Sequence, residues 1–248
     1  LFQRSGGITT AIAEGSIPDG TVFGDAAVGR DGTIWTTTRT GALRIHEGRV
    51  DRITTTTGLL TDLVNRVMID REDNVWFGTE SGASKHVTGP FRTYTVEEGL
   101  PSPFVRALAV DAGGRMWMGT RDGVAVREGE RFRVLPVPGI PDNRVFSLER
   151  EPTDGMLIGT RRGLVWYRED GRIQLYREPQ GVPGEAVFSL LQDGRGGVII
   201  GTEKGLARWE NGRITRLGAP EVSRSGVISL ARDSRGRIWL GRVNGGAA

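Results

Sequence analysis

The sequence of 248 residues contains no cysteine and only two histidines. Disulfide bonds, thiolate metal ligands and cysteine nucleophiles are therefore excluded. Two histidines also leave too little material for a metal-ligand cluster or a Ser-His-Asp arrangement, and neither emerges from the pattern. We expect no cofactor, no metal and no catalytic residue. The compartment stays open on this count, because a chain without cysteine is compatible with both the cytosol and the periplasm.

Long hydrophobic runs are also missing. No apolar stretch approaches the roughly 20 residues that a membrane-spanning helix requires. The opening residues LFQRSGG do not have the pattern of a signal peptide. We therefore expect a soluble segment that makes no membrane contact itself, with any targeting signal outside it.

Neither sign of charge is in large excess. Lysine and arginine number 33 against 30 aspartates and glutamates, a formal charge of +3, and Lys85 and Lys204 are the only lysines. The basic residues are scattered among acidic ones, whereas binding to a nucleic-acid backbone requires basic residues gathered on one face. We expect no nucleic acid as a partner.

What the sequence does contain is abundant glycine between short hydrophobic segments. It has 38 glycines against 11 prolines, and 37% of its residues are hydrophobic. Frequent flexible turns between short apolar runs are typical of an all-β protein. The length is sufficient for one large globular domain or for a repeat array with a continuous core.

A repeated motif runs through the chain: an aromatic or aliphatic residue, an apolar residue, Gly and Thr, followed after two variable residues by Gly. It occurs at Trp76–Thr79, Trp117–Thr120, Leu157–Thr160 and Ile199–Thr202, with degenerate copies at Trp35–Thr38 and Trp239–Arg242. The Thr position falls at residues 38, 79, 120, 160, 202 and 242, in steps of 41, 41, 40, 42 and 40. A period near 40 with short strands is typical of a β-propeller.

Each period divides into four strand-like stretches, as expected for a propeller blade. Turns with Asp and Gly join the first two strands, because Asp bonds its own turn and Gly adopts positive φ. Loops such as Gly139-Ile140-Pro141 separate the blades, since Pro interrupts the hydrogen bonding between strands. In the third copy the strands are Val105–Val110, Arg115–Gly119, Val124–Arg127 and Arg131–Leu135.

The two ends of the sequence are predicted to share one blade. Leu1–Arg4 and Ile8–Ile12 resemble third and fourth strands, whereas Val227–Leu240 supplies a first and a second strand. Joining them closes a ring and removes the exposed edges of an open array. We therefore predict an all-β, six-bladed β-propeller of four-stranded blades, a single domain over residues 1–248 with six repeats of about 41 residues. The alternative is part of a seven-bladed propeller.

The repeat resembles the two-component regulator propeller repeats. The combination Gly-Leu-Pro, Val-x-Ser-Leu, Asp-x-x-Gly and Trp-x-Gly-Thr-x-x-Gly-Leu carries the resemblance, which covers nearly the whole chain. The best-matching stretch is Gly139–Leu164, with Leu157 in place of Trp and Glu151 in place of Asp. The resemblance implies the extracytoplasmic sensor part of a membrane protein whose cytoplasmic end is a histidine kinase, a hybrid regulator or a cyclic-nucleotide signalling enzyme. No phosphoacceptor His box, ATP-binding Gly motif or receiver Asp is recognisable in this chain.

We therefore expect a non-catalytic ligand-sensing or interaction propeller of a bacterial two-component type signalling protein, periplasmic or otherwise extracytoplasmic. Its partner would be a small molecule, an oligosaccharide or a protein, and a homodimer would form through the parent protein. The alternatives are a streptogramin lyase-like propeller enzyme and a cytosolic protein-interaction scaffold. An enzyme would need clustered acids or bases with a metal at one rim, and a scaffold would show a broad exposed aromatic patch.

Two columns of the repeat have structural interpretations. One contains Trp35, Trp76, Trp117, Leu157, Ile199 and Trp239. Because aliphatic residues replace Trp there, we predict a requirement for apolar bulk between blades and not for an indole hydrogen bond. The other contains Asp70, Asp111, Asp193 and Asp233. Each Asp lies in its own hairpin, one period from the next, which favours turn capping over a calcium site.

The two histidines, His46 and His86, are predicted to point to opposite faces. They fall five residues after Gly41 and four after Gly82, the glycines that open their strands. Opposite parity along a strand places side chains on opposite faces. Streptogramin lyase, which looks similar in architecture, depends on histidine and acidic residues with magnesium. The expected placement therefore argues against the enzyme alternative.

The first strand of each blade carries the candidate binding residues, because first strands line the central channel of a propeller. Its small-residue column reads Asp25, Arg66, Ala107, Ser147, Ser189 and Ser229, and the preceding column reads Gly24, Asn65, Arg106, Phe146, Phe188 and Ile228. Polar residues thus gather in blades one to three and apolar residues in blades four to six. We predict that one mouth of the channel, a ligand or partner site, is lined by Asp25, Asn65, Arg66 and Arg106. The alternative is an Asp25–Arg66 ion pair that only fills the axis.

Arginines in the Thr-x-x-Gly turns are predicted to lie beside this mouth. Arg121, Arg161 and Arg162 fall on consecutive blades, and the loops between blades contribute Asn143 and Arg144. Because Arg presents a planar fork of donors, the turn arginines are candidates to receive a carboxylate or a sulfate. The alternative is that they are solvated turn residues.

Overall fold

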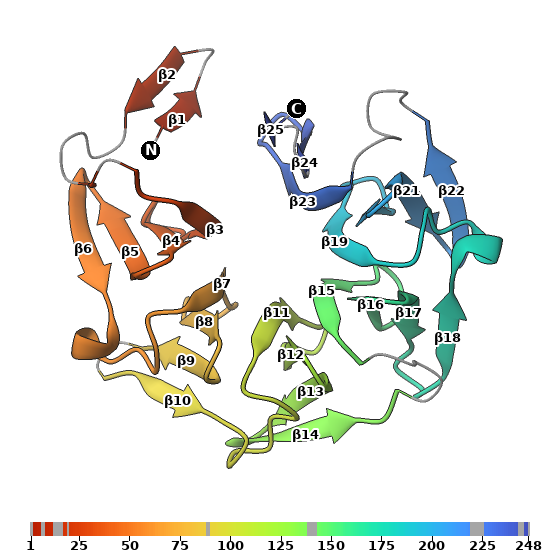
Figure 1. Ribbon diagram of the computed structural model, residues 1–248, viewed down its shortest axis with the longest axis horizontal. Helices are drawn as coiled ribbons and strands as arrows, with labels where there is room; N and C mark the ends of the chain where they lie inside the picture. Colours follow the sequence, from red (N-terminus) through yellow and green to blue (C-terminus); the bar gives the residue numbers. More distant parts are fainter. Residues whose placement is uncertain are drawn as a thin grey trace. The chain divides into compact units, whose positions relative to one another are not determined.

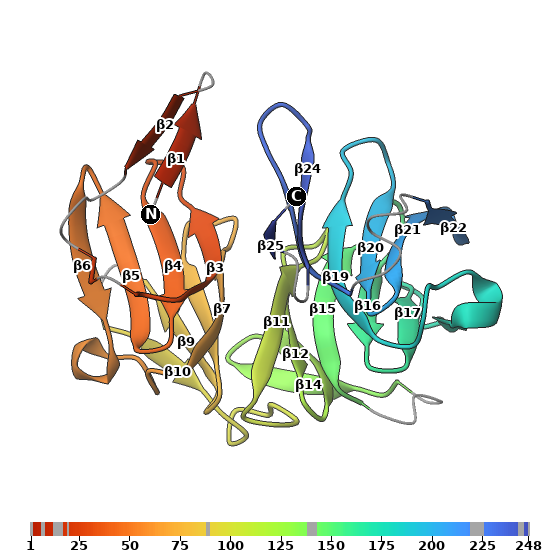
Figure 2. The same cartoon turned by 45° about the horizontal axis from the view of Figure 1, so that its top comes forward.

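The computed structural model describes residues 2–5, 8–11, 17–18, 20–87, 90–137, 143–218, 226–242 and 246–247. The chain forms two compact units, one made of Leu1–Glu97 with Pro103–Val105 and the other of Glu98–Ser102 with Arg106–Ala248. Both units consist of antiparallel β-sheets whose strands follow one another in chain order, as Figures 1 and 2 show.

The first unit contains a hairpin and two four-stranded sheets. The hairpin pairs β1 (Phe2–Ser5) with β2 (Ile8–Ala11). The first sheet consists of β3 (Phe23–Val28), β4 (Ile34–Thr38), β5 (Gly41–His46) and β6 (Arg49–Ile53). The second consists of β7 (Val64–Ile69), β8 (Val75–Thr79), β9 (Ala83–His86) and β10 (Arg92–Tyr94), and the 3-10 helix η1 (Thr55–Thr57) precedes it.

The second unit contains three four-stranded sheets and one of three strands. The third sheet consists of β11 (Val105–Val110), β12 (Met116–Thr120), β13 (Gly123–Glu128) and β14 (Arg131–Leu135). The fourth consists of β15 (Val145–Arg150), β16 (Met156–Thr160), β17 (Gly163–Tyr167) and β18 (Ile173–Tyr176). After η2 (Glu178–Gln180) comes the fifth, with β19 (Val187–Gln192), β20 (Val198–Thr202), β21 (Gly205–Glu210) and β22 (Arg213–Leu217). The last contains β23 (Val227–Arg232), β24 (Ile238–Arg242) and β25 (Gly246–Ala247).

The all-β prediction and the division of the repeat into four strands are confirmed. Strand bounds in the third sheet agree with the predicted ones to within one residue. The predicted loop Gly139-Ile140-Pro141 lies outside the described residues, and so do the outer ends of the predicted terminal strands, Leu1 and Ile12. Among the described strands, β1 pairs with β2, and β24 pairs with β23 and β25. The sharing of a sixth blade by the two ends therefore stays a prediction.

The Gly-Thr-x-x-Gly motif forms the turn between the second and third strands. Thr79 Oγ1 donates to the carbonyl of Gly82 at 2.8 Å and accepts the backbone N–H of Ser81 at 3.1 Å. Gly82 has a φ of 140°, which residues with a side chain rarely adopt. Equivalent hydroxyl bonds begin at Thr38, Thr120, Thr160 and Thr202. Turn chemistry thus explains the fixed spacing of the motif.

In the second unit the Gly before this Thr packs closely against the first strand of the next sheet. A Cβ atom on Gly159 would lie 2.8 Å from Val187 Cγ1 and 2.9 Å from the Val187 carbonyl oxygen. One on Gly201 would lie 2.9 Å from the carbonyl oxygen of Val227. A side chain there would push the next sheet away. The repeat therefore keeps Gly because the next first strand packs against it.

Aromatic side chains fill the space between neighbouring sheets. In the first unit the ring of Trp35 lies 5.9 Å from that of Phe77, and in the second unit Trp117 lies 5.5 Å from Tyr167. The column predicted to need apolar bulk is buried at Trp35, Trp76, Trp117, Leu157 and Ile199, whereas Trp239 is 38% exposed. The prediction of a buried apolar column is confirmed at those five positions.

The indole N–H of this column is also used, which corrects the prediction that only bulk matters. Trp76 Nε1 donates to Asp70 Oδ2 at 2.7 Å, and Trp117 Nε1 donates to Asp111 Oδ2 at 2.8 Å. Asp70 Oδ1 meanwhile accepts the backbone N–H of Asn74 at 2.9 Å, so the predicted turn capping is confirmed. Burial alone would raise the pKa of Asp70, but the bonds from Trp76 and Asn74 outweigh it and hold the pKa below its ordinary value of 3.8.

Where an aliphatic residue replaces the Trp, the acid of the turn binds a different donor. In the fifth sheet Asp193 Oδ2 accepts from Arg208 Nε at 2.7 Å. In the fourth sheet Glu151 Oε1 accepts from Nε1 of Trp209, which belongs to the fifth sheet, at 3.2 Å. The reason is physical: a buried carboxylate without donors is costly, so loss of the indole requires another donor.

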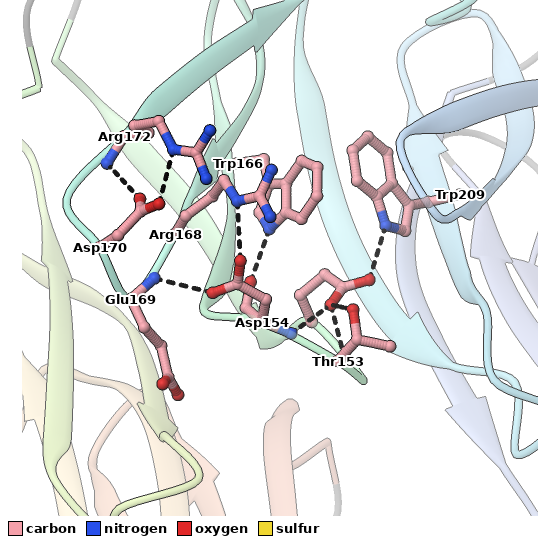
Figure 3. Close-up of polar contacts among 9 residues, drawn as sticks. Thr153, Asp154, Trp166, Arg168, Glu169, Asp170, Arg172 and Trp209 are labelled. Carbon is pink, nitrogen blue, oxygen red and sulfur yellow. Dashed lines mark hydrogen bonds and ion pairs between the residues drawn. The ribbon is translucent and has the colours of Figure 1, made fainter.

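In the turn of the fourth sheet, the carbonyl and the carboxylate of Asp154 accept hydrogen bonds from three residues. Figure 3 shows Trp166 and Arg168 directed at Asp154. Trp166 Nε1 donates to the Asp154 carbonyl at 2.7 Å, and Arg168 Nε donates to its carboxylate at 2.7 Å. The backbone N–H of Glu169 bonds the other carboxylate oxygen at 2.9 Å. These polar contacts fix the rim of the sheet and are structural.

Candidate functional site

A β-bulge interrupts the first strands at the column that precedes the small residues. In β15 the register shifts between Val145 and Ser147, which leaves Phe146 as the extra residue. Corresponding shifts leave Asn65 in β7 and Phe188 in β19 as extra residues. A bulge bends the strand and changes the direction of its side chains. At these bulges the residue of the candidate column does not take part in the regular pairing with the second strand.

In the first unit the polar candidates tie neighbouring first strands together. Asp25 Oδ2 accepts the backbone N–H of Val67 at 3.0 Å, and Asn65 Nδ2 donates to the carbonyl of Val105 at 3.2 Å. Arg66 Nη1 lies 3.4 Å from the Asn65 carbonyl oxygen. Within the described residues Asp25 and Arg66 bond these backbone groups, and no ion pair joins the two side chains. Asp25 and Asn65 have structural roles, and Arg66 is the candidate that retains donors for a ligand.

In the second unit three side chains of the same column lie next to one another. The guanidinium carbon of Arg106 lies 5.8 Å from the ring centroid of Phe146, whose ring lies 5.5 Å from that of Phe188. These three side chains are half-buried, and Ile228, at the corresponding bulge of β23, is 46% exposed. We call Arg106, Phe146, Phe188 and Ile228 the first-strand row. It presents one cation beside an apolar surface.

Three members of the small-residue column of the second unit lie on the packed side of the first strands, whereas Ser229 is exposed. Ala107, Ser147 and Ser189 are all buried. Ser189 Oγ donates over 3.5 Å to the carbonyl of Val227 on the next first strand. The small-residue column is predicted to line a channel, but the bulges before Ser147 and Ser189 direct these two residues toward the neighbouring sheet. The accessible face belongs to the first-strand row instead.

The turn arginines lie at the ends of second strands, as expected. Arg121 and Arg161 are exposed, and the backbone N–H of Arg161 donates to the Arg144 carbonyl at 3.1 Å. Arg162 Nη1 lies 3.9 Å from Glu185 Oε2, so an acid of the protein already balances its charge. Binding of a carboxylate or a sulfate by Arg121 and Arg161 stays a prediction.

One carboxyl group near the first strands is unlike the turn acids. Burial raises the pKa of Glu149 above its ordinary value, although Gln192 Nε2 donates to its Oε1 at 3.0 Å. A raised carboxyl pKa is one component of acid catalysis. In the part of the chain that the structure describes, no three His, Asp or Glu side chains are grouped so that they could hold a metal ion. A single buried acid bonded to an amide provides no acid-base pair.

The two histidines lie at the same interface, contrary to the expected separation. His46 shares a face of β5 with Arg44, which pairs with Trp35, and His86 packs 5.4 Å from the Trp35 ring. His46 Nδ1 lies 2.8 Å from Thr33 Oγ1. Each histidine occupies the face of its own sheet that is turned toward the other sheet. Parity along the strand was counted correctly, but facing sheets bring opposite faces together.

Sequence reasoning missed a pocket at this interface. It has a volume of about 530 Å³ and lies within the first unit, between the turn after β3 and the turn after β7. Gly29, Trp35, Arg44 and His86 are part of its lining. A signal was present in the sequence: Gly29 occupies the position at which the other repeats have an acid.

Comparison with known families supports the repeat assignment. The sequence model of the two component regulator propeller matches residues 99–122. This segment includes the loop before the third sheet and its first two strands. No protein with a curated description matches the sequence. None of the helices in the described part of the chain has the length and hydrophobicity needed to cross a membrane.

Solved structures with a similar fold include two bacterial signalling proteins and one enzyme. The extracellular domain of BT4673 from B. thetaiotaomicron, named a one component system, is 19% identical with a TM-score of 0.82, covering 99% of this chain and 35% of that one. The extracellular domain of the hybrid two component system BT3049 of the same organism is 19% identical with a TM-score of 0.63, covering 96% and 39%. Virginiamycin B lyase from Staphylococcus aureus, a catalytically inactive form with quinupristin, is 14% identical with a TM-score of 0.75, covering 89% and 77%.

These likenesses bear on the fold alone, and the chain spans little more than a third of the length of the two signalling domains. The four-stranded sheets, their order and the repeated turn motif agree with a propeller. Together with the family match at residues 99–122, they confirm the resemblance predicted from the repeats: this chain carries the two component regulator propeller repeat.

Proposed function

We propose that this chain is a non-catalytic propeller that binds a small molecule, such as an oligosaccharide, along the first-strand row. In this proposal it is the extracytoplasmic sensor part of a bacterial two-component type signalling protein. The observation that carries the proposal is the row itself, in which Arg106, Phe146, Phe188 and Ile228 remain partly accessible on neighbouring first strands.

The chemistry of the row suits ligand binding. Ligand sites combine apolar and aromatic walls with a few polar groups that fix orientation. The rings of Phe146 and Phe188 are tilted by 56° and hold each other in place. Arg106 has five N–H donors, and besides its contact with the Phe146 ring no described residue pairs with its guanidinium. The guanidinium therefore stays available for an acidic or hydroxyl group of a ligand.

The signalling role is supported by similarity. BT4673 and BT3049 are named as extracellular domains of one component and hybrid two component systems. The matched family is named for two component regulators. An extracytoplasmic location follows if this chain has the same arrangement in its parent protein.

The enzyme alternative has less support. A lyase of the streptogramin type would need histidine and acidic residues around a metal, and the described residues contain no such cluster. His46 bonds Thr33, and His86 packs against aromatic rings. A protein scaffold would require a broad apolar surface, whereas the exposed large hydrophobic residues of the described chain lie on separate strands and loops.

Arg106→Ala should separate binding from stability. Losing a charged hydrogen bond typically costs about 1.5–3 kcal/mol, so affinity for an acidic ligand should fall by roughly ten- to a hundredfold. Stability should change by less than about 0.5 kcal/mol, because Arg106 is only half-buried. The measurement is a titration with a panel of neutral and uronic-acid-containing oligosaccharides, with urea melts of the same proteins.

Arg133→Ala is the matched control. Arg133 lies on a fourth strand, and its Nε binds Glu128 at 2.7 Å with about half of its side chain exposed. It should leave binding unchanged. Unchanged binding in Arg106→Ala, or equal losses in both variants, would contradict the proposed site. Arg66→Ala tests in the same way whether the first unit contributes.

We also propose that β1 and β2 complete a sixth blade with β23 and β24. β25 pairs only with Gly241 and Arg242, which leaves the rest of that edge of β24 without a described partner. An unpaired edge of this kind is normally covered. Because the chain has no cysteine, spin labels on Gln3→Cys and Arg237→Cys would be unique. Paired strands predict one narrow distance on the order of 15–25 Å, whereas a broad distribution at longer distances contradicts the closure.

A further inference from the structure

Five of the six tryptophans donate their indole N–H to an oxygen of the protein. The acceptors are Asp70 for Trp76, Asp111 for Trp117, the Asp154 carbonyl for Trp166, Glu151 for Trp209 and Asp233 for Trp239. Trp35 is the exception, since none of the described residues accepts from its Nε1. Trp35 is only 6% exposed. The indole N–H of Trp35 is not one of the fully buried unpaired polar atoms, so it remains accessible as a donor.

The first repeat lacks the acid because Gly29 occupies its position. Gly29 directly follows β3, as Asp70 follows β7 and Asp111 follows β11. Asp31 caps this turn instead: its Oδ1 accepts the Thr33 N–H at 2.9 Å, and its Oδ2 accepts the Thr33 hydroxyl at 2.7 Å. The turn is therefore closed, but no carboxylate of the described residues reaches the indole of Trp35.

A cationic side chain lies beside the Trp35 indole, as one does beside Trp76 in the second sheet, where the acid is present. Arg44 pairs with Trp35 across β4 and β5, as Lys85 pairs with Trp76 across β8 and β9. In the second sheet, Trp76 Nε1 and Lys85 Nζ approach the same Asp70 oxygen, at 2.7 and 4.0 Å. In the first sheet, the Arg44 guanidinium lies 5.8 Å from the Trp35 ring centroid. The first sheet thus keeps the two donors, the Trp35 indole and the Arg44 guanidinium, but lacks the carboxylate that the second sheet has.

These donors open into the pocket of about 530 Å³ within the first unit. Gly29, Trp35 and Arg44 are part of its lining, together with His86. Burial lowers the pKa of His86, and the charge of Arg44 lowers it further, which favours the neutral imidazole. The volume falls in the range of pockets that hold small organic molecules.

The charges around the pocket limit the ligand to one carboxylate. Arg30 Nη1 pairs with Asp73 Oδ2 at 3.3 Å, so these two lining residues balance each other. Arg44 lies 3.6 Å from Asp51, an acid that also binds Arg49 Nε at 3.0 Å. Arg44 therefore keeps donors for a ligand.

Acids of the lining act against further negative charge. Asp31 is occupied by Thr33, but Glu72 also lines the pocket and has no ion pair among the described residues. A ligand with two or more negative charges would meet its repulsion.

We propose that this pocket binds the carboxylate of a small organic monoacid, with Trp35 Nε1 and Arg44 as its donors. The ligand carboxylate takes the place of the side chain that Asp70 supplies in the second sheet. A simple organic acid and an acidic sugar share this chemistry. The site lies in the first unit, is separate from the first-strand row, and does not depend on the function proposed for that row.

The test follows the six indole N–H signals of the ¹⁵N-labelled protein during titration with acetate and with glucuronate. Sodium chloride, sodium sulfate and glucose serve as comparison solutes at matched ionic strength. We expect the Trp35 signal, assigned by its loss in Trp35→Phe, to shift saturably with both carboxylates, while the other five stay in place. Tighter binding of glucuronate identifies an acidic sugar as the preferred source, and equal or tighter binding of acetate identifies a simple organic acid. Equal shifts with chloride, sulfate or glucose would overturn the assigned class.

Gly29→Asp supplies the carboxylate from the protein and should abolish the response. Gly29 does not have a positive φ, and its new Cβ would lie 2.7 Å from Asp31 Oδ1, the end of a side chain that can move. We expect the Trp35 signal of this variant to lie at its ligand-bound position and the affinity for acetate to fall at least about tenfold.

Gly29→Ala adds the same Cβ without the charge and should keep most of the binding. The five other indole signals report in every variant that the fold is intact. Binding of acetate to Gly29→Asp with unchanged affinity would overturn the proposal. An equal loss in Gly29→Ala would also overturn it, because the effect would then be steric.

Discussion

Replacing Trp76 with alanine is expected to lower the free energy of unfolding by about 3–5 kcal/mol, the range for removing a large buried aromatic side chain. Trp76 is fully buried, and its ring stacks on that of Tyr94 at 5.4 Å. Its indole N–H binds Asp70. Alanine would leave a cavity and would also remove a donor from a partly buried carboxylate.

Urea melts of the wild type and of the variant measure this loss. Trp76→Phe should fall between the two, since it keeps most of the apolar volume and removes only the N–H. Val96→Ala is the surface control, because Val96 is 53% exposed and its truncation should cost less than about 0.5 kcal/mol. A loss below about 1 kcal/mol in Trp76→Ala would contradict the buried position.

Replacing Gly201 with alanine is expected to cost about 1–3 kcal/mol, although it adds only one methyl group. The new Cβ would meet the hydroxyl of Ser189 and would lie 2.9 Å from the carbonyl oxygen of Val227. The Ser side chain can rotate, but the carbonyl belongs to β23 and moves only with that strand. The substitution therefore acts on the packing between the fifth sheet and β23.

Gly218→Ala is the matched control for this change. Gly218 also lacks a positive φ, and a Cβ there would have no heavy atom within 4 Å. Chemical denaturation of both variants should show a loss in Gly201→Ala and almost none in Gly218→Ala. If the two variants are equally stable, the close approach of neighbouring sheets at this Gly is wrong.

The strands could be predicted from the sequence because turn chemistry sets their limits. Thr79 and Gly82 close a turn through local bonds, and the same two residue types recur at the same spacing in the other four-stranded sheets. Asp111 likewise caps its own turn through the N–H of Arg115. Such contacts join residues close in sequence, so their pattern is visible without a structure.

The pairing of indole and acid is not evident from the sequence, because the two residues occupy different columns of the repeat. Leu157 and Ile199 show that the Trp column tolerates aliphatic residues, which suggested that the indole N–H was unimportant. In those repeats the acids bind Trp209 and Arg208 instead. Donors supplied from another strand or another sheet have no fixed spacing, so the sequence alone does not reveal them.

The candidate site was predicted in part. The two adjacent columns of the first strands were identified, and so was the change from polar to apolar residues along them. Their directions were not, because bulges occur at residues as different as Asn65, Phe146 and Ile228 and have no common residue type. An extra residue in a strand changes which of the following side chains face the neighbouring sheet.

Hydrogen exchange of the free protein, compared with protein saturated by the tightest-binding oligosaccharide of the panel, tests the central claim most directly. The bulges leave the amides of Phe146 and Phe188 outside the regular ladder, where exchange is faster and a bound ligand can slow it. The account predicts slower exchange within residues 145–148 and 187–190, no change in β14, β18 and β22, and an oligosaccharide of unchanged mass. Protection confined to the fourth strands, or a cleaved oligosaccharide, would contradict a non-catalytic binding site on the first strands.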